Sequence, residues 1–142
     1  MIRKFRKPDL DAVMQIWLAS NMEAHDFIPS AYWMDHYDMV RAMLPEVEIY
    51  VHEKKETKTI DGFIGIHEDY IEGIFVKKSM RSKGIGKQLL DYAKNAKTRL
   101  VLKVYQKNNR AIRFYEREHF RIQSEGVDHD TSEKDLLMIW KK

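Results

Sequence analysis

The sequence predicts an α+β fold, in which about four helices flank a mixed, mostly antiparallel sheet of about six to seven strands. Three observations predict this fold. Short segments with the patterning of strands fill much of residues 47–76. A turn with two glycines at 84–86 then opens an amphipathic helix, and an apolar run at 100–104 follows it, which is the order of a βαβ unit. The chain has 142 residues, so we expect one domain over residues 1–142.

Two helices are expected ahead of the first strand. The first follows Pro8 and Asp9, a plausible helix start, and its apolar positions recur at helical spacing: Leu10, Val13, Met14 and Trp17. The second could be capped by Ser30 and stops before Pro45, and its apolar positions are Trp33, Tyr37, Val40 and Leu44. The segment His25–Pro29 interrupts the chain between them.

Three strands should then pair as an antiparallel meander. Residues 47–52 alternate as in a half-buried strand, with Val47, Ile49 and Val51 inside and Glu48, Tyr50 and His52 outside. The polar residues 54–58 form a hairpin loop, and strands follow at 62–66 and 70–76. Because a helix connects 70–76 to 100–104, these two strands should be parallel neighbours. A helix around Ala111 and Phe114 and short strands near 120–122 and 136–140 complete the sheet.

Composition excludes several classes of protein. Hydrophobic residues make up 44% and charged residues 33% of the chain, which is globular composition. No apolar run is long enough to span a membrane and the N-terminus lacks a signal-peptide core, so we expect a cytoplasmic protein without membrane partners. The chain has no cysteine, which excludes disulfides, thiolate metal sites and a cysteine nucleophile. The six histidines show no metal-binding spacing, so no metal is expected.

The segment 77–87 is the best candidate for an anion site. Its basic residues have no acid among them: Lys77, Lys78, Arg81, Lys83 and Lys87. A strand, a glycine turn and a helix together place unpaired backbone N–H groups at the positive end of a helix dipole. A plain strand-to-helix turn would use the same glycines. The Walker A and dinucleotide-binding patterns both fail, since Gln88 follows Gly86-Lys87 and position 89 is Leu.

Two motifs resemble the GNAT superfamily of acyl-CoA-dependent N-acetyltransferases. Residues 81–86 read RSKGIG, and residues 108–120 read NNRAIRFYEREHF, with Asn108, Ala111, Ile112 and Tyr115 in the family's register. His119 stands where a glycine is usual, which affects the turn after that helix. The short length and the His25-Asp26-Phe27 segment look most like the small bacterial YjaB-type members.

The resemblance implies that the chain binds acetyl-CoA as co-substrate. Its pyrophosphate would be held by the backbone N–H groups of one segment: Arg81, Ser82, Lys83, Gly84, Ile85, Gly86 and Lys87. The pantetheine arm would run along Ile74, Phe75 and Val76, in a slot where the fourth and fifth strands splay apart, and Asn108 and Tyr115 would also contact the cofactor. An N–H near Ile74 would polarise the thioester carbonyl.

The same resemblance makes Tyr115 the general acid that protonates the leaving thiolate. Glu72 is a candidate general base, and an ordered water is an equal alternative.

Candidates for the acceptor walls are His25, Asp26, Tyr32, Trp33, Tyr70 and Tyr105. The acceptor would be a primary amine on a small molecule, peptide or protein, and the protein a monomer or homodimer. Two rival functions stay open: an acyl-CoA sensor with little catalysis and, more remotely, a nucleic-acid or other anion binder using 77–87.

Overall fold

A seven-stranded mixed sheet forms the centre of the computed structural model, which describes residues 1–142. Its strand order is β1-β2-β3-β4-β5-β7-β6. The main elements, in chain order, are β1 Ile2–Lys4, α1 Leu10–Ala24, α2 Ser30–Met43, β2 Glu48–Glu53, β3 Ile60–His67, β4 Tyr70–Val76, α3 Ile85–Ala96, β5 Arg99–Tyr105, α4 Asn109–Arg117, β6 Arg121–Val127 and β7 Lys134–Lys141. Short 3-10 turns precede α1 and α3 and follow α2. The predicted fold class is confirmed.

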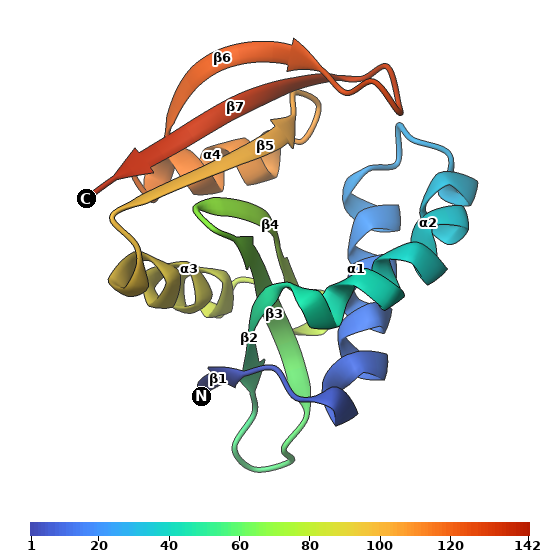
Figure 1. Ribbon diagram of the computed structural model, residues 1–142, viewed down its shortest axis with the longest axis vertical. Coiled ribbons are helices and arrows are strands. Elements are labelled where there is room, and N and C mark those ends of the chain that lie inside the picture. Colours follow the sequence, from blue (N-terminus) through green and yellow to red (C-terminus); the bar gives the residue numbers. More distant parts are fainter.

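Strands β4 and β5 separate almost as soon as they meet. They are the one parallel pair in the sheet, and a single residue pair, Tyr70 with Val101, joins them. Beyond it the two strands diverge, so the sheet divides into a β1–β4 half and a β5–β7 half (Figure 1). The splay predicted for the fourth and fifth strands is therefore present, and the edge of β4 that faces β5 is left without a strand partner over most of its length.

A β-bulge lies in β4 at the same level. Gly65 of β3 pairs with Gly73, but the next residue, Ile66, pairs with Ile71, so Glu72 is an extra residue on the bulged strand. A bulge bends its strand and re-aims the side chains around it. Side chains along 70–76 were expected to alternate between the two faces of the sheet, and this alternation stops at Glu72.

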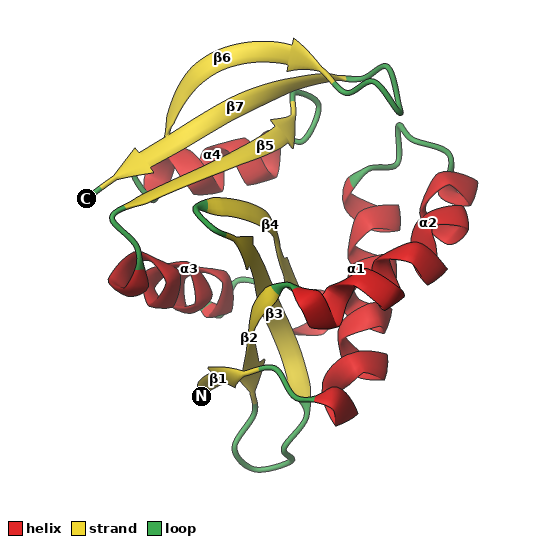
Figure 2. Cartoon of the chain, viewed as in Figure 1, coloured by secondary structure: helices red, strands yellow, loops and turns green.

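Two apolar clusters cover the two faces of the sheet. Helix α3 contributes Leu89 and Leu90, both fully buried, to the larger one. Helix α1 contributes Val13 and Met14 to the other. Figure 2 shows α1 and α2 gathered on one side of the strands and α3 and α4 on the other.

Some local predictions were wrong. Tyr50 was expected outside, but it is buried because α3 covers that face of β2 too. Ser30 is the first residue of α2 and its side chain caps nothing, since Pro29 occupies the cap position. Strand β6 continues to Val127 and so takes in residues that were expected to form a loop. None of the helices has the length and apolar composition of a membrane span.

Candidate active site

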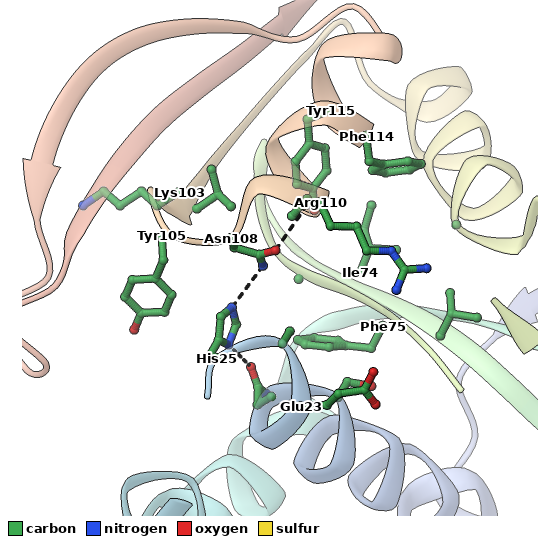
Figure 3. Close-up of a pocket in the computed structure, with 18 of the residues that line it drawn as sticks. Glu23, His25, Ile74, Phe75, Lys103, Tyr105, Asn108, Arg110, Phe114 and Tyr115 are labelled. Atoms are coloured by element: carbon green, nitrogen blue, oxygen red, sulfur yellow. Dashed lines mark hydrogen bonds between the residues drawn. The ribbon is translucent and has the colours of Figure 1, made fainter. Parts of the chain in front are cut away.

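A cavity of about 1290 Å³ opens where β4 and β5 diverge. Its walls come from the bulged part of β4, the start of α3, helix α4, the end of α1 and the segment 127–135. Most of the predicted site residues lie on these walls; Lys83, Asp26 and Tyr32 do not. The cavity brings residues that are far apart in the sequence into one continuous space (Figure 3).

The glycine turn at the start of α3 leaves room against its backbone. Gly84 is the N-cap and has a φ of 80°, a left-handed conformation that favours glycine. A Cβ placed there would meet no protein atom within 4 Å. At Gly86 a Cβ would lie 3.6 Å from the ring of Phe114, an ordinary contact. Packing within the protein therefore does not require glycine at 86, and the free N–H groups of this helix start suit an anion.

The basic side chains around this turn are partly paired already. Arg81 forms an ion pair with Glu23 of α1. Lys87 Nζ lies 3.1 Å from Glu118 Oε1 and 3.3 Å from Asp91 Oδ2. Two further arginines line the cavity from α4 without an ion pair, and the motifs did not identify them: Arg110 and Arg117. Their seven-residue spacing, two helical turns, was the available signal.

The open edge of β4 presents backbone N–H groups to the cavity. Lys77 N donates to Asp61 O of β3 over 2.8 Å. Successive residues of a strand direct their N–H groups to opposite edges, so the N–H groups of Ile74 and Val76 face the gap toward β5. These are the two positions at which a ligand can pair with β4 like an added strand.

Tyr115 lies on α4 and is packed into the base of the cavity. Its ring contacts the rings of Phe114 and Phe120, with centroids 5.2 and 5.5 Å away, and only 8% of the residue is exposed. Burial raises the pKa of its phenol, and the nearby Tyr70 adds to the shift. The phenol is therefore protonated at neutral pH and can donate a proton.

His25 connects α1 to α4 through hydrogen bonds that fix its tautomer. Asn108 Oδ1 accepts from Ala111 N, so its Nδ2 is left to donate to His25 Nε2 over 3.2 Å. On the other side, Asn21 Nδ2 donates to Trp17 O, so Asn21 Oδ1 accepts from His25 Nδ1 over 3.2 Å. His25 thus carries its proton on Nδ1 (Figure 3). Burial lowers its pKa to about 4.

We predict that His25 stays neutral well below its ordinary pKa. A protonated ring would put a second donor against Asn108 Nδ2 and lose that bond. The folded-state pKa lies below the unfolded value, so the unfolded state binds more protons between these values and the contribution of His25 to stability is lost as the pH falls from about 6.5 toward 4. The ring nitrogen shifts of His25 in NMR spectra should report the Nδ1–H tautomer at pH 6. Titration near 6.5 would contradict the arrangement.

Aromatic side chains make the wall next to His25. Its ring lies 5.4 Å from that of Trp33 and 5.0 Å from that of Tyr105. The indole N–H of Trp33 is buried without a hydrogen-bond partner. Tyr32 packs beside Trp33 and His36 and contributes no surface to the cavity, and neither does Asp26.

Carboxylates complete the same end of the cavity. Glu72 lines it, as do three aspartates that the sequence motifs did not identify: Asp128, Asp130 and Asp135. They lie in or next to the β6–β7 connection, whose polar composition predicted only a loop. No group of three or more His, Asp or Glu side chains is arranged to hold a metal ion.

Comparisons with known proteins find acetyltransferases similar to this chain. A sequence-family model described as an acetyltransferase (GNAT) domain matches residues 45–122. The peptidyl-lysine N-acetyltransferase YiaC of Escherichia coli is 34% identical over 99% of this chain and 96% of its own length. The peptidyl-lysine N-acetyltransferase YjaB of E. coli is 26% identical over 85% of this chain and 82% of its own length.

Solved structures agree with these sequence matches. The solution structure of apo YjaB has a TM-score of 0.87, with 26% identity, and covers 98% of this chain and 95% of that one. A Bacillus anthracis protein, crystallised in complex with acetyl coenzyme A, has a TM-score of 0.60 and 25% identity, and the match covers 68% of this chain and 62% of that one.

Proposed function

Because the chain belongs to the GNAT acetyltransferase family, whose members move an acetyl group from acetyl-CoA to an amine, we propose that its acceptor is the side-chain amine of a peptide or protein lysine. The observation that carries this proposal is the composition of the acceptor end of the cavity, where aromatic rings stand beside carboxylates. A lysine side chain, with an apolar stem and a cationic head, suits such a wall. The names of the relatives YiaC and YjaB support it.

In this proposal acetyl-CoA lies along the open edge of β4. The free N–H groups at the start of α3, from Gly84 to Lys87, hold its pyrophosphate, and those of Ile74 and Val76 pair with the pantetheine arm. Asn108, at the start of α4, contacts the same arm. The proposed domain takes in residues 1–142, because the sheet includes both the first and the last strand of the chain.

The transfer then needs two proton-transfer groups, a base for the amine and an acid for the sulfur. The lysine amine loses a proton to Glu72 or to an ordered water, and the neutral nitrogen attacks the thioester carbonyl carbon. The Ile74 N–H stabilises the charge that develops on the carbonyl oxygen. As the C–S bond breaks, the attacking nitrogen gives up a second proton to water, the sulfur takes a proton from Tyr115, and free coenzyme A leaves. Water then returns a proton to the Tyr115 phenolate. The chain has no cysteine to carry the acetyl group, and direct attack in a ternary complex needs no covalent enzyme intermediate.

A pair of peptides tests the acceptor. One has a blocked N-terminus and a single lysine, and the other has a free N-terminus and norleucine in place of that lysine. We expect the lysine peptide to gain one acetyl group, by mass spectrometry, with matching release of thiol and a kcat/KM at least about tenfold higher. Acetylation of the free N-terminus alone would contradict a lysine acceptor.

A further inference from the structure

Four carboxylates line the acceptor end of the cavity and are here called the acidic wall: Glu72, Asp128, Asp130 and Asp135. They come from two elements that approach each other only in the folded chain, the bulge of β4 and the β6–β7 region. A cluster of acids on an open surface is usually solvated, so its members have to be considered one by one.

Asp135 is the least exposed member of the wall. The residue is only 8% exposed, yet it lines the cavity. Its backbone oxygen accepts from Gln106 Nε2 over 3.1 Å, whereas its carboxylate has neither a hydrogen bond nor an ion pair. The carboxylate lies against Gly126 of β6, where a Cβ would come within 3.0 Å of Asp135 Oδ1. An unpartnered carboxylate on a largely buried residue that lines a cavity indicates a ligand with a positive charge.

Glu72 and Asp135, the inner acids of the wall, and the outer Asp128 all lie near Tyr70. This residue lies at the point where β4 and β5 separate. Burial raises the pKa of its phenol, and the charges of Glu72, Asp135 and Asp128 raise it further. Two elements thus direct negative charge at one point beside the splay.

The outer part of the wall is held in place by the aromatic residues. Tyr105 donates its hydroxyl hydrogen to Asp128 Oδ2 over 2.7 Å, and Asp130 N donates to Asp128 Oδ1 over 2.9 Å. Asp128 therefore orders the β6–β7 loop, and Asp130 is exposed at the tip of this loop. The inner and outer carboxylates are parts of one cavity wall.

Two lysines oppose this charge only in part. Lys107 lines the cavity, but its Nζ lies 3.1 Å from Glu133 and 5.3 Å from the ring centre of Phe27. Lys103 is on the same face of β5 as Tyr105 and makes no ion pair. Its side chain extends away from Asn108 and Tyr115 (Figure 3). The wall keeps a negative excess toward an incoming acceptor.

We propose that the acidic wall binds a second, permanently charged group of the acceptor, so that the enzyme prefers a lysine with an arginine close to it in the sequence. This inference rests on the proposed lysine acceptor. The reacting amine has to lose its charge before it attacks, so an ion pair with that amine cannot persist into the transition state. An arginine keeps its charge throughout and can donate to two carboxylate oxygens at once.

Two peptides test this preference, and they differ only in that the arginine of one is replaced by a neutral isostere in the other. Each has a blocked N-terminus and one lysine, with arginine next to it in one peptide and citrulline in the other. For the wild-type protein we expect kcat/KM to be about tenfold higher for the arginine peptide, mainly through KM, and the ratio to shrink as salt is added. In Asp130→Asn and Asp135→Asn the ratio should fall toward one. Asp130 is exposed, so its variant should fold even if that of Asp135 does not.

Glu125→Gln is the matched control, because Glu125 is an exposed acid of the neighbouring strand β6 that makes no ion pair and does not line the cavity. It should keep the wild-type ratio. Equal kcat/KM for the two peptides with the wild-type protein would overturn the inference and leave the lysine acceptor standing. An unchanged ratio in folded Asp130→Asn and Asp135→Asn would also overturn it. Acetylation of neither peptide would overturn the proposed function, and the inference with it.

Discussion

Replacing Tyr115 with phenylalanine is expected to lower kcat about 10²–10³-fold while acetyl-CoA still binds. The phenol is the only proposed proton source for the leaving thiolate, and burial keeps it protonated at neutral pH. Tyr115→Phe removes the hydroxyl and keeps the ring contacts with Phe114 and Phe120, so the fold should be retained. Steady-state thiol release gives kcat, and calorimetric titration gives the affinity for acetyl-CoA.

The control for this variant is Tyr92→Phe. Tyr92 is an exposed residue of α3 that does not line the cavity, so loss of its hydroxyl should leave kcat unchanged. If Tyr115→Phe turns over as fast as the wild type, the assignment of the general acid is wrong. If the wild-type protein itself binds acetyl-CoA and transfers nothing to any amine, the rival function of an acyl-CoA sensor gains support.

Gly86→Glu is expected to weaken acetyl-CoA binding about a hundredfold or more. The new side chain would put bulk and a negative charge at the helix start where the pyrophosphate is proposed to bind. Gly86 is the better position for this test than Gly84, because Gly84 has a φ of 80° and any side chain there is strained. A Cβ at 86 makes only an ordinary contact with Phe114, and glutamate has a higher helix propensity than glycine.

Gln88→Glu is the matched control for Gly86→Glu. It adds the same charge two residues further along α3, at an exposed position that does not line the cavity. Its affinity for acetyl-CoA should stay within a few fold of the wild type. Equal affinities of the wild type and folded Gly86→Glu would show that the turn does not hold the cofactor.

Local patterns were enough to predict most of the fold. The alternation at 47–52 and the strand, glycine turn and helix around Gly84 depend on neighbours in the chain, and the structure confirms these elements. Tyr50 was placed wrongly because its burial depends on α3, which begins 35 residues later. A period of two shows which residues share a face of a strand and not whether both faces are covered.

The residues of the candidate site also fall into two groups, those that a local pattern identifies and those that depend on distant parts of the chain. Asn108 and Tyr115 were found because they belong to one contiguous motif, and both line the cavity. Asp135 was missed because its position depends on how β7 pairs with β5, and nothing beside it in the sequence marks it as part of a site. The contact between His25 and Asn108 joins residues 83 positions apart, and the bulge that re-aims Glu72 is a matter of register with β3. A sequence pattern within one segment does not show which distant residues will contact it.

The central claim is that the gap between β4 and β5 holds acetyl-CoA, and isothermal titration of the purified protein with acetyl-CoA at two salt concentrations tests it most directly. We predict saturable one-to-one binding in the micromolar range, about −8 kcal/mol, weakened by the higher salt without being abolished. The absence of binding at both salt concentrations, in a protein shown to be folded, would contradict the account and make the basic turn a site for another anion.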